Sequence, residues 1–255
     1  MPGELSKRLA RSRARFGTLA SSVHFFRTIE STNDVAAGLA EGAVVLADAQ
    51  TAGRGRRGHS WFSPPGSGLY ASVVVAPRRA QTDPMRATLL LTLAAGVALA
   101  EALEHATGLR ADLKWPNDLY VSGQKLAGIL AEASGELMIL GYGINVASSS
   151  YPPELGDRAT SIESELGRSV DRHEVFVETL AALSRRYDDL LTGRFDAILD
   201  AWRRRAPGAS GARVTWMAHD GLQHGVTAGI DDRGALLVLV GDRTERIVSG
   251  ELTWV

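Results

Sequence analysis

The stretch ATLLLTLAAGVALA, residues 87–100, is the longest apolar run of this 255-residue chain, and the charged residues Arg86 and Glu101 bound it. With 14 residues it is shorter than a membrane-spanning helix, which takes about 20. Pro84 is suited to begin a helix and Gly108 to end one. The sequence therefore predicts a buried core helix over about residues 85–106 and no membrane span.

Shorter patterned segments flank this helix. The apolar runs at 23–26, 43–50, 68–77 and 136–146 predict strands, and the run at 110–134 predicts a strand, a turn and a strand. We expect an amphipathic helix within residues 1–20 and a short helix from about Asn33 to Ala40, capped by Ser31 or Thr32. Helical spacing predicts two more helices over about 172–191 and 194–204.

The pattern changes at APGASGAR, residues 206–213. Beyond it lie short strand-like runs, RVTWMA, GVTAGI, ALLVLVG and RIVSGELTWV, separated by turn signals such as Asp220-Gly221. Several strands in so short a segment predict a small β-barrel. We therefore expect two domains, an α/β unit over residues 1–207 and a β module over residues 208–255.

Composition excludes several kinds of site. The net charge is −1, so the chain has no global attraction for nucleic acid, and any anion must bind to a local cluster. There is no cysteine, which excludes disulfides, thiolate metal sites and a cysteine nucleophile. The six histidines show no metal-binding spacing, so we expect no metal site built from protein ligands alone. No secretory signal is evident, and we expect a cytoplasmic protein.

The segment G-R-G-R-R-G, residues 53–58, has the spacing of a dinucleotide-binding fingerprint. That interpretation needs a helix after the last glycine and an acidic residue about 20 positions on, whereas Pro64 and Pro65 follow here. Kinase and Walker motifs are missing, and three arginines in a near-neutral chain are a weak nucleic-acid site. A solvated surface loop is the remaining plain alternative. Ordering so flexible a loop costs entropy, which favours a lid that closes on an anion.

Lysine is scarce, and two of the three lysines lie close together. Lys114 and Lys125 stand on one predicted hairpin with Asn117 and Asp118, against 25 arginines in the whole chain. Because strand side chains alternate, the two lysines could face one cleft from opposite arms. An exposed hairpin with solvated lysines is the alternative. The segment ESTND offers hydroxyls and an amide suited to a neutral ligand, although an ordinary helix cap has the same residues.

Four segments taken in order resemble the biotin protein ligases, also called biotin–[acetyl-CoA-carboxylase] ligases. They are ESTND (30–34), QTAGRGRRGHSWFSPPGSGLYAS (50–72), KWPNDLYVSGQKLAGIL (114–130) and GYGINV (141–146). The resemblance implies an α+β fold, in which a mixed sheet with helices forms a class II synthetase-like catalytic domain. It also implies that the C-terminal module is the small SH3-like β-barrel of that family.

The resemblance implies a two-step reaction. Biotin is activated by ATP to biotinyl-5′-AMP, and a lysine of a biotin carboxyl carrier protein then takes the biotinyl group. Mg²⁺ is expected to accompany ATP, held mainly by phosphate oxygens. A lid has a purpose in such a reaction, because the acyl-adenylate must be kept from water until the carrier docks.

The resemblance also assigns roles by position, which we state as expectations. Biotin contacts are expected from Ser31, Thr32, Asn33, Gln50, Gly53, Arg54, Gly55, Arg56 and Lys125. Nucleotide contacts are expected from Arg54, Arg56, Arg57, Trp61, Lys114, Asn117 and Asn145, with Trp61 beside the adenine. Catalytic roles are expected for Lys125, Arg56, Lys114 and Asp118, with Asp118 orienting the incoming lysine.

Longer members of the family carry an N-terminal DNA-binding domain and act as repressors. Only about 22 residues precede the first predicted strand here, so we expect no DNA binding and no repressor activity. A homodimer is possible. Three rival functions remain open: a lipoate–protein ligase, a non-enzymatic nucleic-acid binder that uses the basic loop, and a biotin sensor without catalysis.

Overall fold

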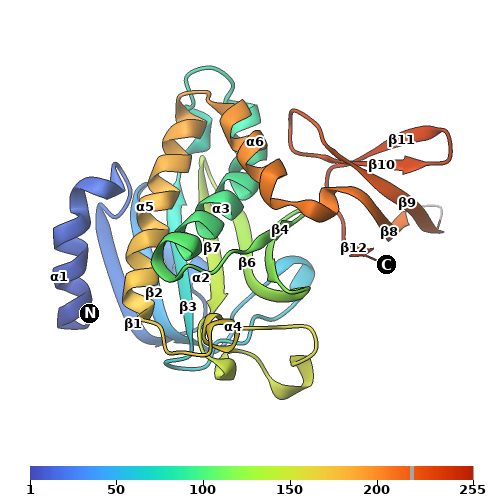
Figure 1. Ribbon diagram of the computed structural model, residues 1–255. Coiled ribbons are helices and arrows are strands. Elements are labelled where there is room, and N and C mark those ends of the chain that lie inside the picture. The colour runs from blue at the N-terminus through green and yellow to red at the C-terminus, as the bar shows by residue number, and fades with distance from the viewer. Residues whose placement is uncertain (219–220, 255) are drawn as a thin grey trace.

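The computed structural model describes residues 1–218 and 221–254, which form two β-sheets with helices packed on the larger one (Figure 1). The larger sheet has seven strands in the order β1-β2-β3-β7-β6-β5-β4, and the smaller one has five in the order β11-β10-β9-β8-β12. Strands β1 and β2 pair in parallel, and the neighbouring pairs from β2 onward are antiparallel. The predicted fold class, a mixed sheet with helices followed by a small β module, is confirmed.

The elements of the larger sheet, in chain order, are β1 (Ser22–Ile29), β2 (Ala43–Gln50), β3 (Gly68–Val75), β4 (Asp112–Lys114), β5 (Asp118–Val121), β6 (Gln124–Ser134) and β7 (Leu137–Asn145). The α-helices are α1 (Gly3–Ser12), α2 (Thr32–Ala36), α3 (Pro84–Thr107), α4 (Ile162–Leu166), α5 (Arg172–Leu191) and α6 (Phe195–Arg205). The smaller sheet comprises β8 (Ser210–Ala218), β9 (Gly221–Ile230), β10 (Leu236–Val240), β11 (Arg243–Ile247) and β12 (Leu252–Trp254).

Helix α3 is the core helix that the apolar run predicts. By length and composition it is apolar enough to cross a membrane, but 72% of its apolar window is buried inside the protein. The Asp83 side chain caps its start by accepting from the backbone N–H of Arg86 at 2.9 Å, and Gly108 ends it with φ +81°. Glycine adopts this left-handed conformation without strain, so the end of the helix is fixed locally.

The two faces of the larger sheet are covered unequally. Val44, Leu46 and Val73 point into the main core with α3 and α5. On the other face, the one helix among the described residues that packs is the short α2, through Ala36 against Val45 and neighbouring apolar side chains. The rest of that second face is therefore open for a binding site, since no long helix covers it (Figure 1).

Several predicted elements differ in detail. The segment 110–134 forms three strands instead of two, because Pro116 cannot donate to a ladder and the chain turns there, so that Lys114 pairs with Asp118. Helix α2 ends at Ala36 rather than Ala40, in a turn closed by a 3.0 Å bond from Leu39 N to the Ala36 carbonyl. Helix α4 was not predicted.

The N-terminal segment forms the predicted amphipathic helix and packs on α5. Leu5, Leu9 and Phe16 are buried in the main core. Beyond α1, Arg15 donates two 2.6 Å hydrogen bonds to the carboxylate of Glu178, whose side chain is only 5% exposed. This contact holds the start of the chain against the helical layer and lowers the pKa of Glu178.

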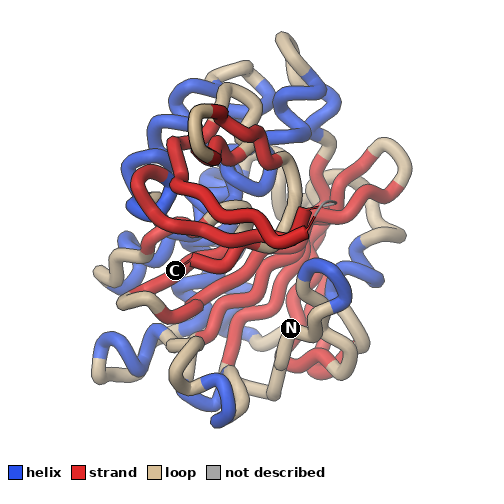
Figure 2. The backbone as a smooth tube through the Cα atoms, turned by 90° about the vertical axis from the view of Figure 1, so that its right-hand side faces the viewer, coloured by secondary structure: helices blue, strands red, loops and turns tan. Residues whose placement is uncertain are grey.

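The C-terminal sheet is antiparallel throughout, and Figure 2 shows it as a curved layer in front of the larger sheet. Among the described residues no strand pairing closes it into a barrel, which fits an open SH3-like sheet. It packs on the larger unit where Trp115 Nε1 donates to the Gly234 carbonyl at 2.9 Å. The boundary between residues 207 and 208 stays a prediction. Asp220, expected in a turn, lies outside the described residues.

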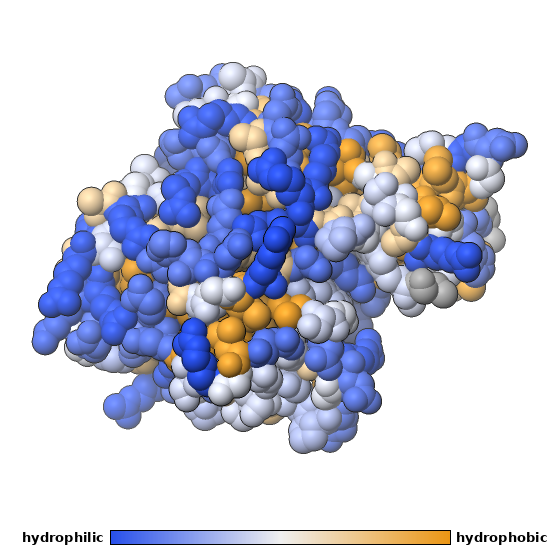
Figure 3. All heavy atoms as spheres, viewed as in Figure 1, coloured by the Kyte–Doolittle hydropathy of each residue, from blue (hydrophilic) through white to orange (hydrophobic). Residues whose placement is uncertain are grey.

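The surface is mostly hydrophilic, with apolar side chains over the C-terminal sheet and in a second patch below the centre of the view (Figure 3). The large exposed apolar residues of this sheet and its loops are Met217, Leu222, Val226, Leu239 and Val248.

Candidate functional site

A pocket of about 750 Å³ lies on the open face of the larger sheet. Its walls are the start of α2, the G-R-G-R-R-G segment, the β4–β6 hairpins, the loop around residues 150–159 and the C-terminal segment 250–254. Of the fifteen residues predicted to form the site, fourteen line this pocket. The exception is Gly53, where an added Cβ would lie 2.5 Å from the Trp61 carbonyl oxygen and 2.8 Å from Ser63 Oγ.

The floor of the pocket is made of glycines that the sequence analysis did not single out. A Cβ added to Gly141 would lie 2.2 Å from Asn33 Oδ1, and one added to Gly143 would lie 2.3 Å from Trp61 Nε1. Gly128 on the neighbouring strand faces the Trp61 ring in the same way, at 3.1 Å. The sequence G-Y-G at residues 141–143 could have indicated this floor, because two glycines separated by one residue in a strand lie on the same face.

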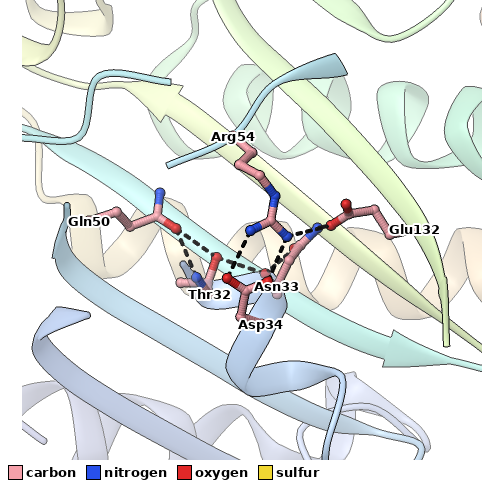
Figure 4. Close-up of polar contacts among 7 residues, drawn as sticks. Thr32, Asn33, Asp34, Gln50, Arg54 and Glu132 are labelled. Carbon is pink, nitrogen blue, oxygen red and sulfur yellow. Dashed lines mark hydrogen bonds and ion pairs between the residues drawn. The ribbon is translucent and has the colours of Figure 1, made fainter. Parts of the chain in front are cut away.

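One end of the pocket carries neutral polar groups that are bonded to each other. The backbone N–H and hydroxyl of Thr32 both donate to Gln50 Oε1, at 2.9 and 3.1 Å. Gln50 Nε2 donates to Ser63 Oγ at 2.9 Å, and Ser72 Oγ donates to Asn33 Oδ1 at 2.6 Å. Figure 4 shows Thr32, Asn33 and Gln50 side by side in this arrangement. We call the pocket residues Ser31, Thr32, Asn33 and Gln50, together with Ser63 and Ser72 that bond to them from outside the pocket lining, the neutral end.

The G-R-G-R-R-G segment forms a short hairpin over the pocket, which we call the lid, residues 53–61. Gly55 N donates to the His59 carbonyl at 2.7 Å, Trp61 N donates to the Gly53 carbonyl at 2.8 Å, and Arg54 pairs with Ser60. The turn is made by Arg57 and Gly58, with φ +54° and +77°. The lid is therefore a hydrogen-bonded hairpin in this structure rather than an irregular loop.

The three lid arginines differ in their surroundings. Arg54 donates two hydrogen bonds to the carboxylate of Asp34, at 2.7 and 2.8 Å, and lies 3.2 Å from Glu132 Oε2. Arg56 is half-buried over the pocket and donates to Asn117 Oδ1 at 3.3 Å. Its burial, together with the neighbouring charge of Arg57, lowers its pKa. Arg57 is exposed. Arg56 is thus the lid arginine that is presented to an anion in the pocket.

Lys114 on β4 and Lys125 on β6 line the same pocket, although β5 lies between these strands and they are not two arms of one hairpin as predicted. Lys125 Nζ lies 2.7 Å from Asp118 Oδ1 and 5.6 Å from the centre of the Trp61 ring. Lys114 Nζ lies between two aromatic rings, 4.7 Å from Tyr120 and 4.5 Å from Trp254 of the C-terminal sheet.

The environment of Lys114 disfavours its charge. Burial lowers the pKa of Lys114, and nearby Lys125 acts in the same direction. Burial also raises the pKa of Tyr120, to about 12. Over the described residues, no carboxylate lies within ion-pair distance of Lys114. A polyanion bound in the pocket would offset the cost of burying the charged form of Lys114.

Two asparagines complete what we call the charged end, which consists of Arg56, Lys114, Asn117, Asp118, Lys125 and Asn145. Asn117 Nδ2 donates to the Ile129 carbonyl at 2.7 Å, and the buried Asn145 Nδ2 donates to the Thr160 carbonyl at 3.0 Å. Both amides therefore use their donors on the backbone. Within the described part of the chain, no three His, Asp or Glu side chains come together as a metal site.

The pocket thus joins a neutral end of hydroxyls and amides to a charged end with three cationic side chains. Such an arrangement suits a substrate with a neutral polar head at one end and a reaction of its other end with a polyanion. Preorganised cations of this kind stabilise negative charge that develops between a carboxylate and a phosphate.

Comparisons with known proteins agree with this geometry. The sequence model of the Biotin/lipoate A/B protein ligase family matches residues 25–145. The chain is 35% identical to the Bifunctional ligase/repressor BirA of Bacillus subtilis, over 98% of this chain and 79% of that protein. It is 37% identical to the Biotin–[acetyl-CoA-carboxylase] ligase of Paracoccus denitrificans, over 82% and 90% of the two chains. The biotin protein ligase of Aquifex aeolicus in complex with biotin and ATP matches with a TM-score of 0.81 and 31% identity, over 92% and 98%.

Proposed function

Because the chain belongs to the Biotin/lipoate A/B protein ligase family, we propose that it is a biotin–[acetyl-CoA-carboxylase] ligase. It activates biotin with ATP and transfers the biotinyl group to a carrier lysine of a biotin-dependent carboxylase. The observation that carries this function is the joining of the neutral end and the charged end in one pocket under a lid.

The first step brings two negatively charged groups together. A carboxylate oxygen of biotin forms a bond to the α-phosphorus of ATP, and the bond to the bridging oxygen breaks, so that pyrophosphate leaves with its electron pair. Lys125 and Arg56 are proposed to offset the repulsion at the reacting atoms, and Lys114 to hold the leaving phosphates. Positioning and electrostatic stabilisation supply most of the catalysis in such a reaction.

The neutral end is proposed to bind the ureido ring of biotin, which needs both donors and acceptors. Thr32 and Gln50 have hydroxyl and amide groups there, and Asn33 is held by Ser72. The glycines of the floor leave the space in which the Asn33 and Trp61 side chains pack against the sheet. Trp61, whose indole lies over Gly128 and Gly143, is proposed to pack beside the adenine.

In the second step the carrier lysine amine bonds to the acyl carbon of biotinyl-5′-AMP, and AMP leaves. Asp118 is proposed to accept the proton of that amine or to orient it, since its buried Oδ1 makes no well-directed hydrogen bond although Lys125 Nζ lies 2.7 Å away. Residues 1–207 are proposed to form the catalytic domain and residues 208–255 an SH3-like domain.

Magnesium fits the site as the partner of ATP. The pocket offers the second carboxylate oxygen of Asp118 and the amide oxygen of Asn145, since Asp118 Oδ1 lies beside Lys125 and Asn117 Oδ1 accepts from Arg56, and so sparse an oxygen set is typical of Mg²⁺ held mainly by phosphates. When bound, the ion would neutralise phosphate charge. A cytoplasmic location and a homodimer stay predictions.

The decisive experiment mixes the protein with biotin, MgATP and an apo carrier domain. We expect streptavidin-reactive carrier and stoichiometric pyrophosphate, both dependent on ATP. Lipoate in place of biotin distinguishes the lipoate–protein ligases: modification with lipoate alone would overturn the proposal. Binding of biotin without release of pyrophosphate would identify a sensor. Salt-sensitive binding of DNA or RNA without carrier modification would identify the nucleic-acid binder.

A further inference from the structure

We propose that Asp34 and Glu132 are positioning residues that hold the lid over the pocket through Arg54. The inference rests on the proposed function, because it assigns the lid the task of protecting an acyl-adenylate. It differs from the expectation that Arg54 itself contacts biotin or phosphate. We call Arg54, Asp34 and Glu132 the lid latch.

The latch joins three separate elements at the rim of the pocket (Figure 4). Arg54 is on the outgoing arm of the lid, Asp34 is on α2, and Glu132 is on β6. Both terminal nitrogens of Arg54 donate to Asp34, which is the paired geometry that gives an arginine–carboxylate contact its directionality. The hydrogen bonds from Arg54 lower the pKa of Asp34.

The charge of Arg54 is already compensated where it stands. Two carboxylates lie within 3.2 Å of its guanidinium, so an incoming phosphate would meet their repulsion as well as its attraction. Arg56, two residues on, is half-buried over the pocket and donates to Asn117. The structure therefore assigns the two arginines different tasks, Arg54 holding the lid and Arg56 meeting the anion.

The latch is connected to the neutral end, and so is the other arm of the lid. Asn33 Nδ2 donates to Glu132 Oε2 at 2.5 Å, and the Oδ1 of the same amide accepts from Ser72. On the returning arm, Ser63 Oγ donates to the Trp61 carbonyl at 3.0 Å and accepts from Gln50. Both arms of the hairpin are thus tied to the groups that are proposed to bind biotin.

The chemistry gives this connection a purpose. A mixed anhydride is lost if water reaches it or if it leaves the pocket before the carrier docks. A lid held at one arm by an ion pair can open without unfolding the sheet beneath it. Removing one carboxylate should therefore loosen the lid while the pocket and the fold remain.

The first test measures the lid without substrates. Trypsin cleaves after arginine, and Arg56 and Arg57 lie at the tip of the hairpin. Cleavage between residues 56 and 58, followed by mass spectrometry, should be about two- to tenfold faster in Asp34→Asn than in the wild type, because a partly exposed ion pair contributes modestly. Glu136→Gln is the matched control, since Glu136 pairs with Arg78 and is 84% exposed.

The second test measures the reaction. In Asp34→Asn and Glu132→Gln, biotinyl-5′-AMP should appear in solution about two- to tenfold faster in the absence of carrier, with an unchanged melting temperature. Asp34→Glu, which restores a carboxylate, should recover much of the retention, and Arg54→Lys, which keeps the charge but loses the paired geometry, should not.

The outcomes separate the two proposals. If the wild type forms no adenylate, the proposed function fails, and the trypsin measurement still tests the latch. Should the wild type form adenylate while both carboxylate variants retain it and are cleaved at wild-type rates, the latch is refuted. Equal effects in Glu136→Gln would also refute it, because the change would then be a general effect of charge.

Discussion

The two ends of the pocket differ in how far their polar side chains are already paired with other protein groups. At the neutral end, the polar side chains are bonded to each other, with Gln50 joining Thr32 to Ser63. At the charged end, Lys114 and Arg56 are partly removed from water, and burial lowers the pKa of both. The neutral end is therefore stable as it stands, whereas the charged end carries cations whose desolvation an anion would offset.

This difference in pairing predicts at which end of the pocket substrate binding should stabilise the protein. Groups that are already paired gain little when a ligand replaces one partner by another. Cations that are desolvated and incompletely paired gain a partner when polyphosphate arrives. We therefore expect changes at the charged end to act on rate and on ATP, and changes at the neutral end to act on biotin.

The largest effect is expected at Lys125. Lys125→Ala removes the cation proposed to lie beside the reacting carboxylate and α-phosphate, and adenylate formation should fall by about 10²- to 10³-fold. Release of pyrophosphate in a single turnover measures it. Lys7→Ala is the matched control, because Lys7 is exposed on α1. A Lys125→Ala enzyme with the wild-type rate would refute the assigned role.

The next largest effect is expected at the floor of the neutral end. In Gly141→Ala the new Cβ would lie 2.2 Å from Asn33 Oδ1, so Asn33 must move and its bonds to Ser72 and Glu132 must change. Overpacking costs about 1–3 kcal/mol of stability. We expect the displacement of Asn33 to cost biotin binding a similar amount, which corresponds to a rise in the KM for biotin of roughly 5- to 150-fold.

The KM for ATP should change little in Gly141→Ala, because the substituted residue lies at the neutral end. This variant therefore tests directly whether the two ends act separately. Gly3→Ala is the control, since a Cβ at Gly3 meets nothing within 4 Å. A variant in which both KM values rise equally would show that the two ends do not act separately.

Much of this arrangement was predictable from local patterns. The core helix, the α5 boundaries and the strand that ends at Gln50 follow from caps, periodicity and β-branched runs, which depend on neighbouring residues alone. The predicted proximity of Lys114 and Lys125 rested on strand alternation, although the structure places them on β4 and β6 with β5 between them. These features need no knowledge of the tertiary contacts.

The features that were missed depend on contacts between distant segments. The pairing of Arg54 with Glu132 and the position of Trp254 over Lys114 join residues far apart in the chain, and no local pattern encodes them. Gly141 and Gly143 were missed for a different reason, since a glycine in a strand has several explanations until the side chain above it is known. The sequence could not distinguish the three lid arginines for the same reason, because their different partners lie on distant segments.

A smaller effect is expected where the C-terminal sheet meets the charged end. Trp254→Ala removes one of the two rings beside Lys114, and a cation–π contact is worth about 0.5–2 kcal/mol, so the KM for ATP should rise by roughly 2- to 30-fold. The KM for biotin should stay constant. Met217→Ala is the matched control on the same sheet, with 74% of Met217 exposed. An unchanged KM for ATP would mean that the sheet does not position Lys114.

The smallest effect is expected in the pH dependence of the charged end. Because burial lowers the pKa of Lys114 below its ordinary value of about 10.4, this side chain loses its proton earlier than a solvated lysine as the pH rises. The charged form binds phosphate, so kcat/KM for ATP should fall on the alkaline side, by about twofold where the pH reaches the lowered pKa.

The stability of the free protein should change in the opposite direction. A lowered folded pKa makes the charged lysine unfavourable below that pKa, and the penalty disappears as the pH rises toward the unfolded value. Lys114→Arg keeps the charge at all these pH values and should flatten the alkaline fall in kcat/KM. If Lys114→Arg shows the same alkaline fall in kcat/KM as the wild type, a group other than Lys114 titrates. Desolvation of Lys114 would then not contribute to the difference between the two ends of the pocket.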